Sequence, residues 1–407
     1  MTTMTTRDVM TMVWVGLVAA LAMGLGACGD SAEEGSEVDS AALARARAAI
    51  PSAEQLQASA PGGMAMAESG LREQALVGEL ALYPQESYPI VLGVNSAVGD
   101  MVTLLKTVTG VPPTVYNSET QEFLWGPWPY EGSVGNVAVY IKENPPGEDF
   151  AYVYAFVRLM DNDLGGGSVV IWGGSNPDPD GDETRGSGLT LWDFEANHAF
   201  EAANNPAGAP EASDRGRFLA LYGKGPSADD PEAEVTTVLA AFRGFVPSDN
   251  PGAEPADADY YYGQVATAEH TVDFLNYALT LDIDDGDGDP NTQVASAPEL
   301  LDVKMVFLDQ GRGRAEAIAS GGDIADSPEI DLLEVVECWD EQIKETYLGM
   351  TAYGDDGSEI GAQSLGDPSG CAPIFDNSID ALMIPTLDDV DPTLKAQMDA
   401  LATGGVQ

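Results

Sequence analysis

Short β-strand patterns separated by Gly, Pro, Asp and Asn recur along the chain from about Val115, and they restrict the fold more than any other feature. Segments such as 151–158 and 303–308 are rich in β-branched and aromatic residues, which is typical of half-buried strands. The patterns predict strands at 120–125, 136–143, 151–160, 167–174, 187–194, 216–222, 234–245, 259–266, 270–282, 300–309, 314–320 and 332–339.

The connections between these strands are too short for crossover helices, which predicts an antiparallel meander. About a dozen strands rarely form one open twisted sheet, so we expect closure into a barrel or folding into a sandwich. A membrane-spanning barrel is disfavoured, because the strands lack regular spacing and an apolar outer band. The sequence therefore predicts a mainly β protein, with an antiparallel meander closing into a barrel-like or sandwich domain at 115–350.

Two segments precede the predicted β domain. Residues 28–70 are rich in Ala, Ser, Glu and Gly and contain a short helical stretch that ends at Pro51, which indicates a tether or linker. Residues 71–114 have apolar residues at helical spacing and predict a helical segment, with Ser96 as an N-cap and Gly110 at its end.

An uncharged apolar run from Met12 to Ala27 is short for a membrane span and suits a signal peptide. Its end, Leu25-Gly26-Ala27-Cys28, resembles the lipobox of bacterial lipoproteins. The resemblance implies that 1–27 is a signal peptide and that Cys28 carries the acyl chains of a lipid anchor, including the fatty acid (palmitate) on its amino group. Gly29 after the cysteine implies sorting to the outer membrane. An ordinary secretory signal with a chance cysteine is the alternative.

The two remaining cysteines agree with export. Cys338 and Cys371 form an even pair in an oxidising compartment, and we expect them to form a disulfide bond. Two buried free thiols are the alternative. The bond would tie down a C-terminal extension at 351–407, which carries a short helix pattern at 391–403.

Two tryptophan motifs stand near the ends of the predicted strand run. They are Trp125-Gly126-Pro127-Trp128 and Glu337-Cys338-Trp339-Asp340, with a lone cysteine further on. This order of landmarks over residues 116–371 resembles a group of uncharacterised acidic lipoproteins from Gram-negative bacteria. The resemblance supports the predicted architecture, and no activity is implied by it.

The charge of the chain excludes one class of partner. Among 407 residues, 67 are acidic and 17 basic, a formal net charge of −50. A nucleic-acid binder needs a basic face for the phosphate backbone, so we expect no nucleic acid as a partner. Adaptation to an ion-rich exterior explains the charge better than a specific function does.

Two acidic loops are candidate calcium sites. The first carries Asn176, Asp178, Asp180 and Asp182; the second carries Asp285, Asp287 and Asp289. Oxygen ligands at alternate positions can converge on a hard cation such as Ca²⁺. Neither loop follows the EF-hand pattern, because the residues that should supply its glycine or its bidentate glutamate are replaced. Solvated acidic turns are the simpler alternative.

Candidate catalytic residues are few. His198 lies close to acidic residues and His270 begins a predicted strand, but no nucleophile elbow is present. We therefore name no catalytic residue and expect both histidines to be surface or rim residues. Trp125, Trp128 and Tyr130 suit a sugar-stacking platform or, more simply, a core plug.

Three smaller patterns predict local structure. Gly165–Gly167 and Gly311–Gly313 predict turns between strands and not phosphate-binding loops. Trp172 and Trp192 lie at equal distances from a loop centre near Asp182, which predicts a cross-strand pair.

The leading functional interpretation is a non-enzymatic cell-envelope lipoprotein, lipid-anchored in the outer membrane, whose β domain binds an apolar small molecule or an envelope protein. A calcium-stabilised surface scaffold or adhesin is the alternative, with Ca²⁺ as its only cofactor. A hydrolase is the third and weakest interpretation.

Overall fold

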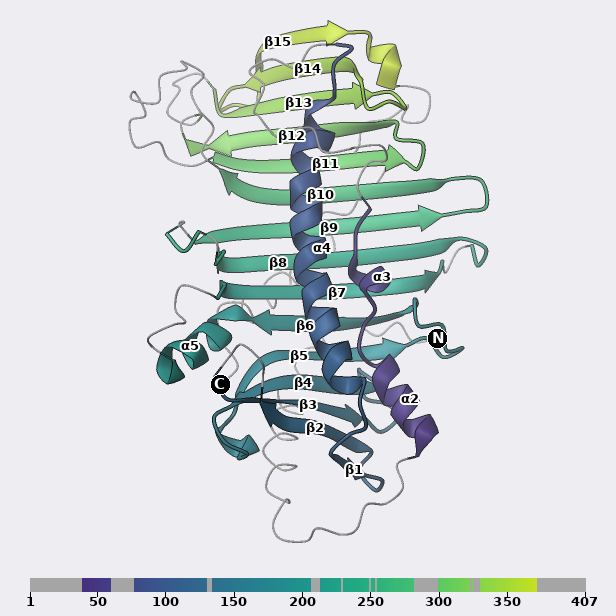
Figure 1. Cartoon of the computed structure of the whole chain (residues 1–407). Helices are drawn as coiled ribbons and strands as arrows, with labels where there is room; N and C mark the ends of the chain where they lie inside the picture. The colour runs from purple at the N-terminus through teal and green to yellow at the C-terminus, as the bar shows by residue number, and fades with distance from the viewer. Residues whose placement is uncertain are drawn as a thin grey trace.

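The computed structural model describes residues 39–371, except 60–76, 130–133, 206–212, 228–229, 249, 253–254, 282–298, 323 and 325–329. The described residues form one sheet of 15 strands, each paired with the next strand in the sequence (Figure 1). All pairs are antiparallel. The mainly β class and the antiparallel meander are therefore confirmed.

The strands are β1 (Val115–Asn117), β2 (Glu122–Pro129), β3 (Asn136–Glu143), β4 (Tyr152–Leu159), β5 (Ser168–Pro177), β6 (Gly186–Asp193), β7 (Arg215–Pro226), β8 (Glu234–Val246), β9 (Ala256–Ala266), β10 (Thr271–Leu281), β11 (Glu299–Leu308), β12 (Gly313–Gly321), β13 (Leu332–Trp339), β14 (Glu345–Tyr353) and β15 (Glu359–Gly366).

The sheet does not close, and β1 and β15 are its two edges. The sequence did not predict β1, β14 and β15, so the sheet continues to Gly366, beyond the predicted end of the β domain at residue 350. β1 has only three residues, and every residue of β15 is exposed. Neither strand has the alternation of buried and exposed residues that makes a strand recognisable in a sequence.

Four helices are described: α2 (Ser40–Ala48), α3 (Ala53–Leu56), α4 (Leu82–Thr109) and α5 (Phe194–Asn204). α4 runs across the strands on one face of the sheet, from the level of β13 to that of β4 (Figure 1). The predicted helical segment is confirmed in α4, but Ser96 does not cap it. The helix begins at Leu82, and Ser96 is an exposed residue in its interior. The predicted end at Gly110 is correct, since Gly110 is the C-cap.

The sheet buries apolar side chains on both of its faces. On β9, Tyr260 and Tyr262 belong to the cluster that includes α4, whereas Tyr261 between them belongs to a second cluster on the opposite face. The second cluster includes Leu159, Leu189, Leu219, Leu239 and Val306. Because side chains alternate between faces, strands buried on both sides have nearly continuous apolar sequences, as β4 and β8 do.

The predicted pair of Trp172 and Trp192 is wrong by one residue. The register of β5 and β6 places Ile171 opposite Trp192, and Trp172 opposite Leu191. A shift of one residue moves a side chain to the other face of the sheet. Trp172 is accordingly in the second cluster, while Trp192 packs against the cluster of α4.

Both predicted turns are present. Leu164–Gly166 forms a short 3₁₀ turn between β4 and β5. Between β11 and β12, the N–H of Leu308 donates to the carbonyl of Arg312, and the N–H of Gly311 donates to that of Leu308.

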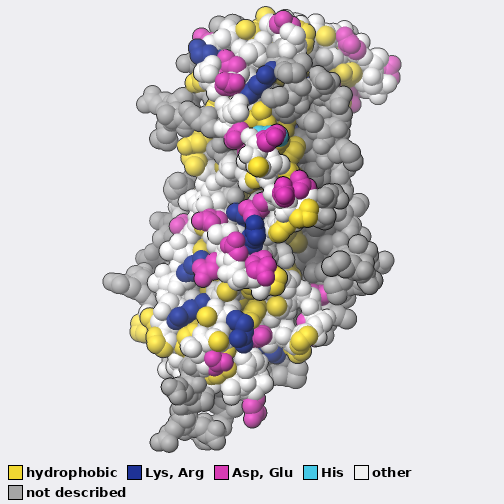
Figure 2. Space-filling view, turned by 90° about the vertical axis from the view of Figure 1, so that its right-hand side faces the viewer, with side chains coloured by type: hydrophobic (Ala, Val, Ile, Leu, Met, Phe, Trp, Pro, Cys, Tyr) yellow, Lys and Arg dark blue, Asp and Glu magenta, His cyan; other side chains and the backbone are white. Residues whose placement is uncertain are grey.

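α5 is attached to the sheet by buried ion pairs. Arg158 of β4 is 3% exposed and donates to Glu201 at 2.6 Å, and its guanidinium lies 4.6 Å from the ring of Phe200. Asp193 accepts a hydrogen bond from Arg217 and also from the N–H of Ala196 in the first turn of α5. Elsewhere acidic and basic side chains are interspersed on the surface, as one side of the molecule shows (Figure 2).

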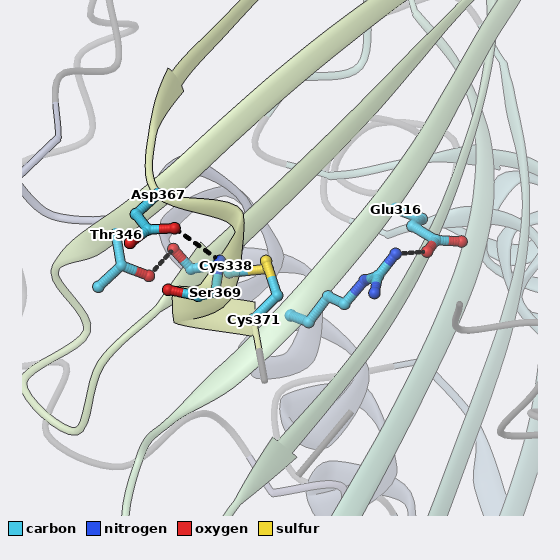
Figure 3. The surroundings of a disulfide bond; sticks show 7 residues. Glu316, Cys338, Thr346, Asp367, Ser369 and Cys371 are labelled. Atoms are coloured by element: carbon cyan, nitrogen blue, oxygen red, sulfur yellow. Dashed lines mark hydrogen bonds and ion pairs between the residues drawn. A yellow bond between two sulfur atoms is a disulfide. The ribbon is translucent and has the colours of Figure 1, made fainter. Parts of the chain in front are cut away.

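The predicted disulfide bond is confirmed. Cys338 of β13 and Cys371 are joined, with their Cα atoms 5.4 Å apart. Cys371 ends a 3₁₀ turn, η3 (Pro368–Cys371), that follows β15 and lies against β13 and β14 (Figure 3). The bond therefore fastens the exposed edge strand to the sheet.

We expect Cys371→Ser to loosen the edge locally instead of unfolding the protein. A disulfide that closes a loop of 33 residues contributes about 4 kcal/mol in the chain-entropy model. β15 buries no side chain, so it can separate from β14 without disturbing either core. Hydrogen exchange should show faster exchange in β14 and β15 and a global unfolding midpoint that falls much less. Equal loss of protection throughout the sheet would contradict this.

Candidate functional site

The contact between α4 and the sheet is the centre of the structure. The buried side chains of α4 recur every three or four residues: Tyr83, Pro84, Ser87, Val91, Val94, Val98, Met101, Val102, Leu105, Val108 and Thr109. They face a layer of sheet side chains rich in tyrosine, including Tyr154, Tyr222, Tyr260, Tyr262 and Tyr277. By length and composition α4 is apolar enough to cross a membrane. In this structure it lies along the sheet.

The N-terminus of α4 is held by a carboxylate from β13. Glu337 is fully buried, and its two oxygens accept hydrogen bonds from the N–H groups of Leu82, at 2.6 Å, and Tyr83, at 2.8 Å. These N–H groups have no partner within a helix, and a negative charge there is favoured by the helix dipole. Ala81 at the N-cap has no side chain that could do the same. Glu337 thus replaces a local cap.

The segment before α4 is fixed at the same place. The N–H groups of Gly78 and Ala81 donate to the carbonyls of Glu345 and Ile343, and the N–H of Glu345 donates to the carbonyl of Glu79. This short bridge brings the side chain of Glu345, which is 1% exposed, next to Glu337. Apart from the carboxyl of Glu337, no described residue offers a hydrogen-bond donor to the oxygens of Glu345.

Burial determines how these two carboxyls ionise. The pKa of Glu337 is raised to about 8, and burial is the largest cause. The neighbouring Glu345 also raises this pKa, whereas the two backbone N–H donors lower it. Burial also raises the pKa of Glu345. Two charges side by side in a dry site are costly, so the pair retains one proton at neutral pH.

The C-terminus of α4 is held by an arginine from α2. Arg47 donates from Nε to the carbonyl of Thr109 at 2.8 Å, and from Nη2 to those of Gly110 and Val111 at 3.1 and 2.9 Å. The buried indole of Trp125 donates to the same Val111 carbonyl at 2.8 Å. A positive charge on the last carbonyls complements the helix dipole, as a negative charge does at the other end.

Arg47→Met should destabilise the protein by about 2 kcal/mol, because it removes charge-assisted hydrogen bonds from three carbonyls at a helix end. Arg45→Met is a matched control from the same helix. Arg45 is half exposed and interacts with Glu143 at 3.4 Å and with the hydroxyl of Tyr152, so its loss should cost about 0–1 kcal/mol. Urea unfolding of both variants measures the difference, and equal losses would show that the position of the charge at α4 is unimportant.

A buried polar network lies beneath the N-terminal segment. The side chain of Asp273, 3% exposed, accepts hydrogen bonds from Tyr262 at 2.6 Å and Gln264 at 2.7 Å, and the Tyr262 hydroxyl also forms a hydrogen bond with Ser59 Oγ at 3.0 Å. Burial raises the pKa of Asp273. Asn95 of α4 pairs with both backbone groups of Ala58, so the segment after α3 is attached to α4 as well as to the sheet.

The structure does not gather the first acidic loop into a ligand set. Asp178 accepts hydrogen bonds from the N–H groups of Asp180 and Asp182, and Asp182 accepts them from Thr184. Asn176 is engaged elsewhere, because its Oδ1 accepts from Ala151. The part of the chain that the structure describes contains no group of three His, Cys, Asp or Glu side chains placed to hold a metal ion.

The other sequence-predicted residues divide into two groups. The first group lies outside the described residues: Cys28, Tyr130, the second acidic loop with Asp285, Asp287 and Asp289, and the C-terminal helix pattern at 391–403. His198 on α5 forms a hydrogen bond between Nδ1 and Ser213 Oγ at 3.0 Å, and His270 is exposed in the turn before β10. Trp125 is fully buried and Trp128 packs against the same core, which supports the core plug and not a sugar platform.

Sequence reasoning did not identify Arg47, Glu337 or Glu345 as the residues that hold α4. Glu337 belongs to a motif that the sequence singled out, and an acidic residue between apolar ones in a predicted strand was a usable signal. Arg47 gave no comparable signal, since its contacts lie more than 60 residues away. No family model, no curated protein and no solved structure matches the chain.

Proposed function

We propose that this protein is a cell-envelope lipoprotein that works as a non-enzymatic binding module, and that the sheet face under α4 is its site for an apolar ligand. The observation that carries the proposal is the way in which α4 is attached to the sheet. The apolar face of the sheet is covered by α4 together with the shorter α2 and α3, and the two ends of α4 are held by polar contacts. Displacing such a helix exposes an apolar, tyrosine-rich surface suited to an acyl chain or another elongated apolar molecule.

The tyrosine layer supports this assignment. Tyr260 is buried, and its hydroxyl group has no hydrogen-bond partner among the described residues. A buried hydroxyl without a partner is costly, and a structure retains it where it has a use. Hydroxyl groups scattered over an apolar face can bind the polar end of an amphipathic ligand while the rings contact its chain.

The test is binding of a fluorescent fatty acid, dansyl-undecanoic acid, to the soluble protein from Gly29 onward. We expect saturable binding that strengthens in Arg47→Met, because α4 is then displaced at lower cost, and that is unchanged in Arg45→Met. Native mass spectrometry of protein from its own host should also show a bound mass of a few hundred daltons. No saturable binding, or equal binding by both variants and the native protein, would contradict the proposed site.

The lipid anchor has its own test. We propose that Cys28 carries the acyl chains and that the anchor holds the domain at the outer membrane; the lipobox resemblance supports this, and the disulfide bond agrees with export. Cys28→Ser should abolish labelling with a radioactive fatty acid and release the protein from the membrane fraction. Label that persists would show that Cys28 is not the modified residue.

A further inference from the structure

The edge strand β15 is an unusual feature for a soluble sheet. All eight of its residues are exposed, and within the described part of the chain it pairs only with β14. It contains no proline or lysine, and its residues from Ile360 to Gly366 carry no charge. Natural sheets protect their edges with short strands, prolines, bulges or charges, because a free edge recruits other strands. The opposite edge, β1, is protected by its length of three residues.

The free edge is also held ready for pairing. β15 has no buried side chain to fix it, but the disulfide between Cys338 and Cys371 and the turn η3 fasten its end to β13 and β14 (Figure 3). The N–H of Asp367 also donates to the carbonyl of Thr346. A strand that is ordered before binding loses less conformational entropy when a partner adds to it.

Acidic residues stand at both ends of this uncharged strand. Asp355 and Asp356 precede it, Glu359 is its first residue, and Asp367 follows it. Hydrogen bonds from Ser358 and Ser369 fix the carboxylates of Asp356 and Asp367 and lower their pKa values, so both are charged at neutral pH. Ile360 and Leu365, each nearly half exposed, add apolar contacts between the two acidic ends.

We propose that the outer edge of β15 is a docking site for an extended segment of a partner polypeptide that is uncharged in its middle and basic at both ends. Backbone hydrogen bonds to β15 would give affinity, and the acidic ends would select the partner by charge. A second copy of this chain fits less well. Antiparallel pairing of two β15 strands would place Glu359 of one copy near Asp367 of the other, and each chain carries a net charge of −50.

The test uses a fluorescent peptide of alternating valine and threonine flanked by lysines, and fluorescence anisotropy with the full soluble protein. Two matched peptides accompany it: one with glutamates in place of the lysines, and one with N-methylated backbone amides. Gln363→Lys places a charge in the middle of the edge on an exposed side chain, so the protein should fold normally. Asn117→Lys places the same charge on β1 as a control.

We expect the lysine-flanked peptide to bind and to protect β15 from hydrogen exchange. Gln363→Lys and N-methylation should each weaken binding by about tenfold or more, and Asn117→Lys should not. Four outcomes would overturn the proposal: no binding, equal binding of the glutamate-flanked peptide, equal binding of the N-methylated peptide, or equal effects of the two lysine variants. Sedimentation that shows a dimer abolished by Gln363→Lys would also overturn it, in favour of a second copy.

Discussion

The unfolding free energy of this protein should fall between pH 5 and pH 8, and Glu345→Gln should reduce that fall. Burial and the adjacent carboxyl raise the pKa of Glu337 from its ordinary value of 4.5 to about 8. Between these two values the folded pair binds a proton that the unfolded chain has lost. Stability therefore decreases as the pH rises, by about 1.4 kcal/mol per unit and about 5 kcal/mol in total.

Glutamine at position 345 should change the pH dependence of stability for a physical reason. The amide removes the second carboxyl and supplies an N–H donor to Glu337 in place of the shared proton. Glu337 can then be ionised with the N–H groups of Leu82, Tyr83 and the new amide as donors. We expect the variant to match the native protein near pH 5 and to be more stable at pH 8.

Glu337→Gln is the matched control. It removes the negative charge from the N-terminus of α4 and leaves Glu345 buried, so some pH dependence should remain and stability should be lower. Urea unfolding at intervals from pH 5 to pH 8.5 measures all three proteins. A native protein with constant stability over this range would show that the pair does not share a proton.

The strands of the sheet could be predicted well from the sequence, but the way in which one face of the sheet is covered could not. Predicted strands such as 136–143 and 332–339 coincide with β3 and β13, because their sequences are rich in β-branched and other apolar residues. A barrel-like or sandwich domain was expected to bury so much apolar surface. In the structure the sheet stays open, and one of its faces packs against α4, whose first residues include Pro84 and Pro89 and are not typical of a helix.

The candidate site was harder to predict because its residues are distant in the sequence. Cys338 with Cys371 could be paired by counting, since two cysteines have one partner each. The hydrogen bonds of Glu337 with Leu82 and of Arg47 with Thr109 join residues that are far apart in the sequence and meet only in the folded protein. The acidic loop at 176–182 is the opposite case, because its candidate ligands are neighbours in the sequence. Its residues alternate as ligands would, but the carboxylates of Asp178 and Asp182 are used to close their own turns.

Trp125→Ala should be one of the most damaging single substitutions in the protein, at about 3–5 kcal/mol. Trp125 is fully buried, its ring lies 5.8 Å from that of Phe123, and its indole N–H donates to Val111 just beyond the end of α4. The substitution leaves a cavity where β2 meets this helix end.

Trp125→Phe distinguishes the contribution of the packed ring from that of the hydrogen bond. Phenylalanine fills most of the space, and the Val111 carbonyl still accepts a hydrogen bond from Arg47, so no buried acceptor is left alone and the loss should be only about 1 kcal/mol. Trp128→Ala, at a less buried position of the same motif, should lie between the two. Urea unfolding at pH 5.5, where Glu337 is protonated, gives all three values. If phenylalanine were as damaging as alanine, the hydrogen bond to the end of α4 and not the packing of the ring would be what makes this tryptophan necessary.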